Sequence, residues 1–404
     1  MKKIKVLIVD DSRIMRKLIS SVLETDERLE VVGQAEHGVE CLEKVVQLQP
    51  EVVTLDLNMP VMDGLTVLRE SKARNLKATY LVVSSLAKRD AQITLDAINE
   101  GAIDFILKPS QAFNIASMGK EIVEKILIAS VQARKMASGE PEPAAPVPTG
   151  SIPATGADAP PADAPASPPP ADAPVAAGQQ VSSGLAAATA RMMQQRAQAA
   201  AAAAASGPIV VEQKWKRAEL NVIGGSSGSI QTLVKIVPVL PAAFEQAVVI
   251  VLHLPPFFTT QFTAQLGHKC PVPVVEAADG MVLAGKQVYL APGGDRNVVI
   301  RRREDGQAVF RLVDNDANSM YTPSIDILMA SAAETYKAQC RGVLISGTGN
   351  DGVEGLRSIR NGGGGTYVQD KATAIANQLP FAALKAGVVD KALSIQDIVD
   401  MLSV

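Results

Sequence analysis

The feature that most constrains the fold of this chain is a long central segment that cannot contribute to a hydrophobic core. Alanine and proline dominate this segment, and no aromatic residue occurs between Phe113 and Trp215. Such a composition buries too little apolar surface to offset the entropy lost on ordering. We therefore expect a linker over residues 136–208, flanked by two domains at residues 1–135 and 209–404 that each fold around their own core.

The linker itself has two different halves. Its first half is rich in proline, which favours extended and semi-rigid conformations. Its second half, GLAAATARMMQQRAQAAAAAAAS, has a high helix propensity but few side chains that could pack against another element. A tether is the expected role, and a partner-binding helix around Met192 and Met193 is the alternative.

Composition narrows the class of protein. The chain has 404 residues, of which 47% are hydrophobic and 20% are charged, and its formal net charge is −3. This charge gives no reason to expect nucleic acid or an acidic lipid surface as a partner. No apolar stretch approaches the ~18–20 residues that span a bilayer, and the apolar run in MKKIKVLIVDD is too short for a signal peptide. We predict a cytoplasmic protein that is not inserted in a membrane.

On both sides of the linker, short apolar runs alternate with amphipathic stretches, a pattern typical of parallel sheets covered by helices. The runs expected to be strands are residues 4–9, 29–34, 52–55, 80–85 and 104–107 in the first domain, and 220–223, 247–252, 287–291 and 342–346 in the second. We predict two α/β domains with doubly wound parallel sheets, the first flavodoxin-like and the second a Rossmann-like three-layer domain.

Polar residues follow the predicted strands of the first domain, where functional groups of doubly wound sheets gather. Asp10 and Asp11 follow the first strand, Asp56 follows the third, Ser84 ends the fourth, and Lys108 follows the fifth. Three carboxylates at one edge suit Mg²⁺. Ser84 and Lys108 could hold the oxygens of a phosphoryl group on Asp56. Ordinary turn and helix-cap chemistry is the alternative, and it explains any one of these residues better than all of them together.

This set resembles the receiver domain of two-component response regulators. The pattern of that family is an acidic pair, a phospho-accepting Asp followed by M-P-x-M-D-G, a Ser or Thr, and Lys-Pro. The chain has Asp10-Asp11, DLNMPVMDG from Asp56, Ser84 and Lys108-Pro109. The resemblance spans residues 1 to about 130. It implies phosphorylation of Asp56 by a histidine kinase, Mg²⁺ bound by the three aspartates, and a switch through Ser84 and Lys108.

A cluster of glycine and serine directly follows the first predicted strand of the second domain, in NVIGGSSGSI at residues 221–230. The stretch lacks the lysine of the phosphate-binding G-x-x-x-x-G-K-[ST] pattern, and its glycines do not match G-x-G-x-x-G. A nucleotide-binding domain is therefore the weaker interpretation. The glycines could instead let one serine hydroxyl stand clear of a tight turn at the start of a helix.

A nucleophilic serine needs a base, and the base needs an acid that orients it. Of the three histidines, His37 lies in the first domain and His268 follows a predicted helix, whereas His253 directly ends the strand AVVIVL. Asp351 lies just beyond the strand GVLIS. Ser226, His253 and Asp351 could therefore converge beyond the ends of separate strands. Each also has a structural alternative, namely a helix cap for the serine and the aspartate and a sheet-edge hydrogen bond for the histidine.

These motifs resemble the catalytic domain of the chemotaxis protein-glutamate methylesterases, the CheB family. That family has I-G-A-S-T-G-G, Q-H-M-P followed by F-T, and T-G-M-G-x-D-G; this chain has IGGSSGS, LHLPPFFT and SGTGNDG. The resemblance runs from about residue 218 to the end, and the order receiver, linker, esterase is the family's own. It implies Ser226 as nucleophile, His253 as general base and Asp351 as its orienting carboxylate.

The resemblance also implies a function. We expect phosphorylation-activated hydrolysis of glutamyl methyl esters on methyl-accepting chemoreceptors, with a chemotaxis histidine kinase as phosphodonor and the same chemistry able to deamidate glutamine. Amides of the turn at residues 225–228 are the expected oxyanion donors, and the esterase needs no cofactor. The alternative is a catalytically weak, receiver-controlled adaptor. It draws on the positions that depart from the family pattern: Ser229, Arg296, Thr348 and Gln378-Leu379.

Overall fold

The computed structural model describes residues 2–85, 87–109, 115–138, 218–315 and 320–404, together with residues 146 and 215. The linker expected over residues 136–208 lies outside the described residues, apart from residue 146 and residues 136–138, which end a helix. The alternative helix around Met192 and Met193 also lies outside them. None of the described helices is long and apolar enough to cross a membrane.

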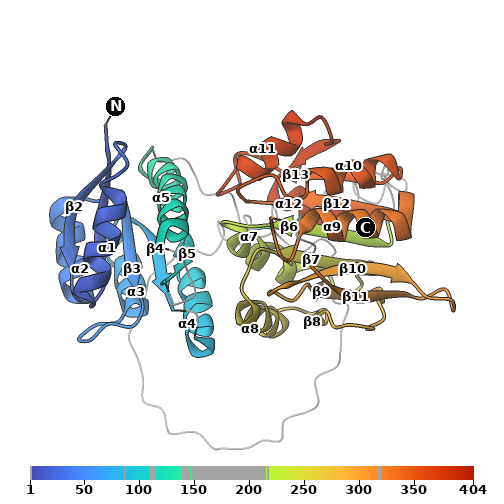
Figure 1. The fold of residues 1–404 in the computed structure, drawn as a ribbon, viewed down its shortest axis with the longest axis horizontal. Helices are drawn as coiled ribbons and strands as arrows, with labels where there is room; N and C mark the ends of the chain where they lie inside the picture. The colour runs from blue at the N-terminus through green and yellow to red at the C-terminus, as the bar shows by residue number, and fades with distance from the viewer. Residues whose placement is uncertain are drawn as a thin grey trace, which may run out of the picture. The chain divides into compact units, whose positions relative to one another are not determined.

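The first domain is a five-stranded parallel sheet with the order β2-β1-β3-β4-β5 (Figure 1). Helices α1 and α5 pack together on one face, and α2, α3 and α4 pack in succession on the other. Each strand that the sequence predicted here is present. The elements are β1 Ile4–Val9, α1 Arg13–Leu23, β2 Leu29–Ala35, α2 Gly38–Leu48, β3 Val52–Asp56, α3 Gly64–Ala73, β4 Thr79–Ser84, α4 Lys88–Asn99, β5 Asp104–Leu107 and α5 Ile115–Ser138.

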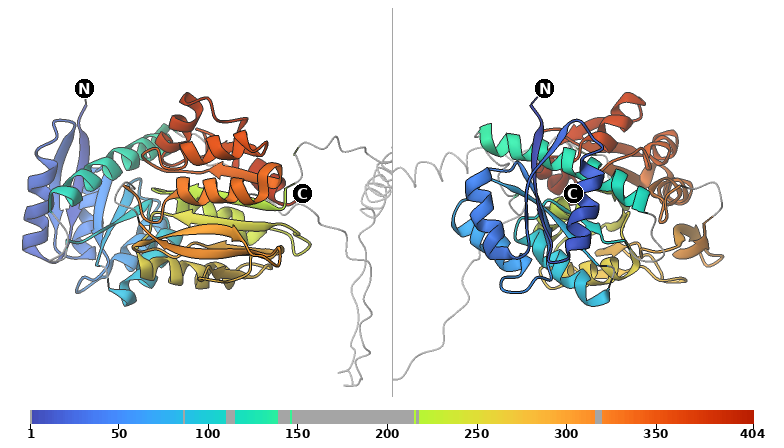
Figure 2. Two further views of the ribbon diagram at one scale, coloured as in Figure 1. Left: turned by 45° about the vertical axis from the view of Figure 1, so that its right-hand side comes forward. Right: turned by 60° about the vertical axis from the view of Figure 1, so that its left-hand side comes forward.

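The second domain is built on a seven-stranded parallel sheet with the order β14-β13-β12-β6-β7-β9-β8. Helices cover both faces of the sheet, with α9 packed on α10 and α7 packed on α12 (Figure 2). The elements of the sheet and its helices are β6 Leu220–Gly225, α7 Ser229–Ile236, η1 Val237–Val239, β7 Ala247–Leu252, α8 Pro256–Gly267, β8 Val274–Glu276, β9 Gln287–Leu290, α9 Ile325–Tyr336, η2 Lys337–Gln339, β12 Cys340–Leu344, α10 Val353–Asn361, β13 Gly365–Gln369, α11 Gln378–Lys385, β14 Lys391–Leu393 and α12 Ile395–Leu402.

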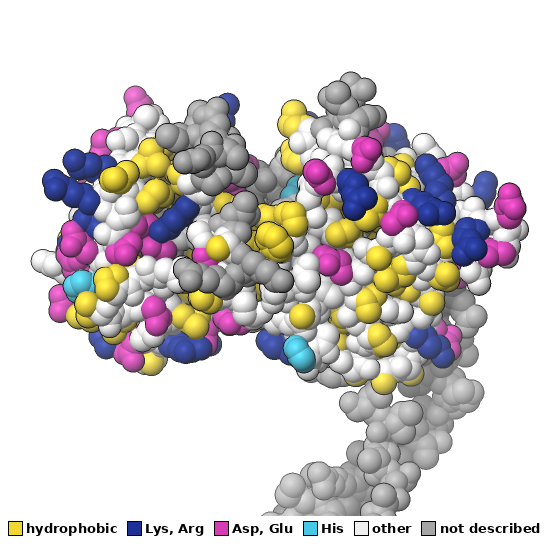
Figure 3. All heavy atoms as spheres, turned by 60° about the horizontal axis from the view of Figure 1, so that its bottom comes forward, with side chains coloured by type: hydrophobic (Ala, Val, Ile, Leu, Met, Phe, Trp, Pro, Cys, Tyr) yellow, Lys and Arg dark blue, Asp and Glu magenta, His cyan; other side chains and the backbone are white. Residues whose placement is uncertain are grey.

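The prediction of two doubly wound parallel sheets is confirmed, and the structure adds an antiparallel ribbon to the second domain. Strands β10 (Arg296–Arg302) and β11 (Ala308–Asp314) pair with each other and α9 packs against β10. Val298, Ile300 and Phe310 are buried beneath the ribbon. Basic and acidic side chains are interspersed on the face drawn in Figure 3.

Each sheet has a point where the chain reverses its direction of winding. In the first sheet β1 lies between β2 and β3, and in the second β6 lies between β7 and β12. Helices leave the crevice beyond such strand ends open, so ligands of open α/β sheets bind there. The topology therefore brings the loops after β1 and β3 together in the first domain, and those after β6, β7 and β12 together in the second.

Helix α10 lies so close to β12 that a side chain at Gly342 would have to displace the ends of two buried side chains of that helix. An added Cβ would lie 2.6 Å from Cδ2 of Leu356 and 2.7 Å from Cδ1 of Ile359. We predict that Gly342→Ala lowers the free energy of unfolding of this domain by about 1–3 kcal/mol, the usual effect of overpacking, measured as a shift of its urea transition.

Gly267→Ala is the matched control for that substitution. Its new Cβ would meet nothing nearer than the Val274 carbonyl oxygen at 3.7 Å. Its stability should stay within about 0.5 kcal/mol of the wild type. A Gly342→Ala variant as stable as this control would contradict the close packing of α10 on the sheet.

Candidate active site

The carboxylate of Asp351 is the most heavily hydrogen-bonded group at the edge of the second sheet. It lies in the loop between β12 and α10 with 4% of its surface exposed. Oδ2 accepts from Nε2 of His253 at 2.8 Å and from the amide of Ile325 at 2.7 Å. Oδ1 accepts from the Ser324 hydroxyl at 2.9 Å and from the amide of Asp326 at 3.0 Å. Each oxygen thus takes two donors, which fills the acceptor sites of a carboxylate.

This environment fixes the protonation of the pair. Burial by itself would raise the pKa of Asp351, but the hydrogen bonds from His253 and from the amides of Asp326 and Ile325 outweigh it and hold that pKa below its ordinary value. The carboxylate is therefore ionised near neutral pH and has no proton to donate. His253 must donate through Nε2, which leaves the lone pair of the neutral imidazole on Nδ1.

A stacked tyrosine fixes the plane of the histidine ring. The rings of His253 and Tyr321 lie parallel, with centroids 4.6 Å apart and an angle of 8° between their planes. Tyr321 belongs to the segment before α9, and its hydroxyl approaches Gly349, where an added Cβ would lie 2.6 Å from it. No role for Tyr321 follows from the sequence pattern, because no predicted strand ends near it.

Ser226 lies on the tight turn between β6 and α7. Its amide donates to the Ser346 carbonyl at 3.1 Å. Its hydroxyl accepts from the amide of Thr348 at 2.8 Å and donates to the Thr348 carbonyl at 3.4 Å. No hydrogen bond within the described part of the chain joins the Ser226 hydroxyl to His253. Catalytic hydrogen bonds are often long or poorly aligned in free enzymes and tighten when substrate binds.

The same contacts bear on where an oxyanion could be held. Of the amides expected as donors at residues 225–228, that of Ser226 is occupied by the Ser346 carbonyl. The amide of Thr348, on the loop after β12, instead lies directly beside the Ser226 hydroxyl. This close approach requires glycine at position 347, since an added Cβ would lie 2.7 Å from Oγ of Ser226. Thr348 is therefore a further candidate donor beside the amides of Ser227 and Gly228, and the sequence pattern did not reveal it.

A buried polar network holds the loop after β12 against the serine turn. The hydroxyl of Ser346 donates to the Ser227 carbonyl at 2.8 Å and accepts from the amide of Ala376 at 2.8 Å. The side-chain oxygen of Gln369 accepts from the Ser346 amide at 2.8 Å. Ser346 and Gln369 are fully buried. Because each of these bonds is buried and satisfied, the network keeps the turn and the loop in one arrangement.

The helix-cap alternatives are wrong for the positions weighed. The N-cap residues of helices α7 and α10 are Gly228 and Gly352, and neither helix has a side-chain cap bond at that position. Asp351 does cap a helix, but it caps α9, through the amides of Ile325 and Asp326, rather than the helix that follows it in the chain.

The first domain brings its predicted residues to one edge as well. Carboxylate oxygens of Asp10, Asp11 and Asp56 lie within 4.8 Å of one another, and the first and third of these residues are buried. Nζ of Lys108 lies 2.9 Å from Oδ2 of Asp10 and 2.7 Å from Oδ2 of Asp56. The hydroxyl of Ser84, at the end of the neighbouring strand β4, accepts from that of Thr94 at 2.7 Å.

The donor set of this edge fits a hard divalent cation. Carboxylate oxygens are the ligands that Mg²⁺ prefers, and it normally binds through a few of them and retains waters. Burial raises the pKa of Asp56, and the nearby charge of Asp10 adds to the shift while Lys108 opposes it, so a bound cation would favour the ionised carboxylate. The acidic cluster is compatible with Mg²⁺.

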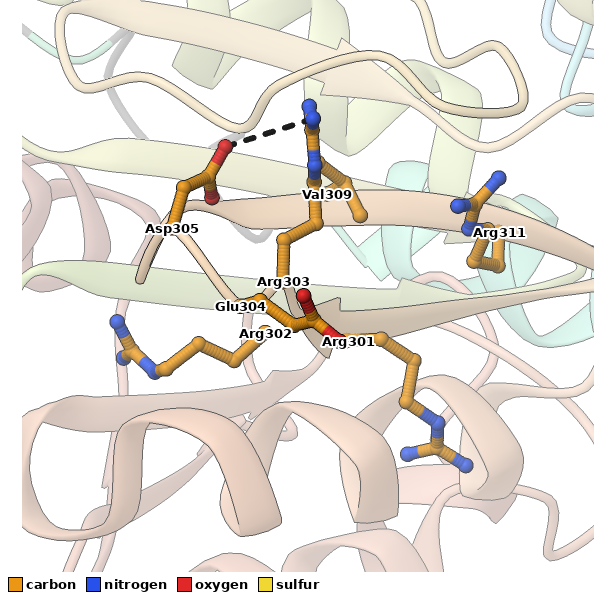
Figure 4. Close-up of a pocket in the computed structure, with 7 residues that line it drawn as sticks. All are labelled: Arg301, Arg302, Arg303, Glu304, Asp305, Val309 and Arg311. Atoms are coloured by element: carbon orange, nitrogen blue, oxygen red, sulfur yellow. Dashed lines mark ion pairs between the residues drawn. The ribbon is translucent and has the colours of Figure 1, made fainter.

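A separate hollow in the second domain lies beside the β10–β11 ribbon (Figure 4). Arginines dominate its lining, and several pair with carboxylates: Arg303 with Asp305 at 3.4 Å and Arg311 with Asp279 at 3.3 Å. The residues that line it are Arg301, Arg302, Arg303, Glu304, Asp305, Val309 and Arg311. This lining includes neither a nucleophile nor a histidine, so we do not associate the hollow with catalysis.

Comparison with known proteins finds a matching family model for each domain. The family model for the response regulator receiver domain matches residues 6–119, and the model for the CheB methylesterase matches residues 221–402. The protein-glutamate methylesterase/protein-glutamine glutaminase 1 of Vibrio cholerae is 33% identical over 99% of this chain and 98% of its own. The corresponding protein of Caldanaerobacter subterraneus is 32% identical over 98% of this chain and 96% of its own.

Solved structures of related domains exist for each half. The CheB methylesterase catalytic domain of Thermotoga maritima is 31% identical and covers 46% of this chain and 98% of its own, with a TM-score of 0.44. The response regulator domain of Thermotoga maritima CheB is 34% identical and covers 32% of this chain and 98% of its own, with a TM-score of 0.30.

The two domains therefore define a response-regulator hydrolase, in which a receiver domain accompanies a methylesterase-type catalytic domain. The chain belongs to the family of the protein-glutamate methylesterases/protein-glutamine glutaminases, to which it is similar over nearly its whole length.

The geometry at Asp351 predicts the tautomer of His253. Because the carboxylate has no proton to donate, neutral His253 should carry its proton on Nε2. Long-range ¹H–¹⁵N correlation spectra of histidine-labelled protein should show this tautomer above the titration of the imidazole. Asp351→Ala should weaken the preference and give signals of mixed tautomers. A signal for His253 protonated on Nδ1 in the wild type would contradict the assignment.

Proposed function

We propose that Ser226, His253 and Asp351 form the catalytic triad of a protein-glutamate methylesterase. The observation that carries the proposal is the directed hydrogen bond from His253 to an ionised, fully coordinated Asp351. This bond leaves Nδ1 as the basic nitrogen. Ser226 directly follows β6 and His253 directly follows β7, and these two strands are neighbours in the sheet. The amide of Thr348 beside the serine supplies a donor for developing negative charge.

The reaction follows from these groups. Nδ1 of His253 takes the proton of the Ser226 hydroxyl as Oγ attacks the carbonyl carbon of a glutamyl methyl ester. The Thr348 amide stabilises the oxyanion, and His253 returns the proton to the departing methoxide, so that methanol leaves. Water, activated by the same nitrogen, then hydrolyses the glutamyl-enzyme ester. Asp351 stays ionised and stabilises the imidazolium throughout. A glutamine side chain would follow the same course with ammonia as the leaving group.

The proposed substrates are methylated glutamates in proteins, as the names of the similar proteins indicate, and we propose chemoreceptors as the proteins that carry them. The rival reading is an adaptor whose catalytic domain binds signalling proteins without turnover. Release of methanol from methylated receptor separates the two, because an adaptor produces none.

Substitution of the two adjacent serines tests the nucleophile. Ser226→Ala should lower kcat for methanol release by at least about 10⁴-fold, as loss of a triad nucleophile does, while the folded protein keeps its thermal transition. Ser227→Ala is the matched control and should keep substantial activity, because the described contact of Ser227 with the network is made by its carbonyl. An essential Ser227 with a dispensable Ser226 would contradict the assignment.

We further propose that the receiver domain controls this activity. Asp10, Asp11 and Asp56 would hold Mg²⁺, whose chemistry when bound is to neutralise phosphate oxygens. Lys108 would then pair with the phosphoryl group on Asp56, and the hydroxyl of Ser84 would turn toward it. A phosphoryl group adds about −1.5 to −2 charges at this edge, which would draw on the same lysine that now bridges Asp10 and Asp56. We propose a chemotaxis histidine kinase as its source.

Receiver control has its own test. Asp56→Asn should stay at low basal activity when a small phosphodonor and Mg²⁺ are added, whereas the wild type should be activated. Removing Mg²⁺ with EDTA should abolish the activation without changing the basal rate, because the esterase chemistry runs through Ser226 and His253.

Truncation separates inhibition from recruitment. Deletion of residues 1–208 should give activity without any phosphodonor if the unphosphorylated receiver blocks the site. A properly folded truncation no faster than unphosphorylated full-length protein would rule out such a block, and phosphorylation would have to act by organising or recruiting the catalytic domain.

A further inference from the structure

Two aspartates near the active site exchange helix caps. Asp351, which precedes α10, accepts from the first amides of α9, those of Ile325 at 2.7 Å and Asp326 at 3.0 Å. Asp326, in the first turn of α9, accepts through Oδ1 from the amides of Gly352 at 2.8 Å and Gly355 at 2.6 Å, where α10 begins. Asp351, which precedes α10, therefore caps the start of α9, and Asp326, which belongs to α9, caps the start of α10.

The exchange is possible because the two helices meet almost backbone to backbone. A Cβ added at Gly355 would lie 2.6 Å from Cβ of Met329 and 3.2 Å from Cα of Asp326. Gly352 has φ 107°, in the left-handed region that favours glycine, and an added Cβ there would lie 2.8 Å from Cγ2 of Ile325. The positive ends of both helix dipoles thus point at the two carboxylates.

The consequence reaches the catalytic histidine. The amide of Gly352 belongs to the peptide bond that directly follows Asp351, and it donates to the carboxylate of Asp326. α10 has no side-chain cap at its own N-cap position, so Asp326 supplies the side-chain acceptor seen at this helix start. If Asp326 released these amides, the backbone that carries Asp351 would be free to shift, and with it the oxygen that orients His253.

We propose that Asp326 is a positioning residue of the esterase reaction, which fixes Asp351, and through it His253, by holding the amides of Gly352 and Gly355. This inference rests on the proposed esterase function. Asp326 touches neither the histidine nor the serine in any described contact, so its effect would reach them through Asp351, by way of the backbone that follows Asp351 and of the charge beside it.

The charges of the pair agree with this division of roles. Burial raises the pKa of Asp326 to about 6, and the adjacent charge of Asp351 adds to the shift, whereas the amides of Gly355 and Gly352 oppose it. The pKa of Asp351 is lowered. When their environments shift the pKa values of two carboxyl groups in opposite directions, the two groups have different roles. When a proton binds the pair, it goes to Asp326, and Asp351 keeps the charge that the imidazolium needs.

Three substitutions at Asp326 separate position from charge. Asp326→Asn keeps an acceptor at the same distance from the backbone but removes the charge. Asp326→Glu keeps the charge but moves it by one methylene group. Asp326→Ala removes the acceptor. Glu354→Gln is the matched control, since it neutralises an exposed acid of the first turn of α10 that pairs with Arg357.

The assay uses the full-length chain with Mg²⁺, acetyl phosphate as phosphodonor and p-nitrophenyl acetate as the ester probe. We expect Asp326→Asn to keep kcat within about threefold, and Asp326→Glu and Asp326→Ala to lower it by about 10- to 100-fold, the effect of misplacing a catalytic group by about 1 Å. KM should change by less than about twofold, since Asp326 does not contact substrate. Glu354→Gln should match the wild type.

Two results would overturn the inference. A purely structural cap predicts that folded Asp326→Ala, with a lowered thermal transition, keeps the wild-type kcat. A requirement for charge predicts that Asp326→Glu is active and Asp326→Asn is not; this comparison decides the matter even if Asp326→Ala does not fold. A wild type that hydrolyses neither the probe nor methylated receptor would instead refute the proposed function, and this inference with it.

Discussion

The arrangement of the catalytic edge depends on one buried carboxylate, that of Asp351. An ionised group removed from water is destabilising by several kcal/mol unless it is fully hydrogen-bonded. Asp351 meets this requirement with four donors drawn from separate elements: His253 after β7, and Ser324, Ile325 and Asp326 at the start of α9. These same bonds tie the end of β7, the loop after β12 and the start of α9 together. The ionised carboxylate that orients His253 therefore also holds these three elements in place relative to one another.

Both domains use the same topology for different chemistry. In each sheet the functional side chains lie beyond the carboxyl ends of strands that flank the winding reversal. In the first domain, carboxylates converge on each other and on Lys108, an arrangement suited to a cation and a phosphoryl group. In the second, the ionised carboxylate of Asp351 accepts from the His253 imidazole, and the carboxyl group of Asp326 lies beside it. The difference lies in the partners of the acids: Asp10 and Asp56 share the ammonium group of Lys108, whereas Asp351 accepts from His253 and from backbone amides.

Much of this could be predicted from the sequence, because the central strands are continuous apolar runs whose ends carry the reactive residues. Strands β6, β7 and β12 and the positions of Ser226, His253 and Asp351 follow from that pattern. The β10–β11 ribbon does not, because β10 begins and ends in exposed arginines and the second half of β11 is mostly exposed, so that both look like surface segments. Tyr321, Ser324 and Asp326 also escape the pattern. They gather at the start of α9, where Ser324 reads locally as an ordinary helix cap, and only the tertiary approach of α9 to α10 gives them a second role.

The positions at which the chain departs from its family's motifs can now be judged by what they contact. Thr348 contributes its amide to the Ser226 hydroxyl, and any residue but proline has that group. Ser229 donates its hydroxyl to the Ser226 carbonyl and so adds to the order of the turn. At Leu379, the amide donates to the Gly347 carbonyl at 2.9 Å, which again depends on the backbone and not on the side chain. These three substitutions therefore leave the backbone donors beside Ser226 in place. Their side chains can affect the selection of substrate instead.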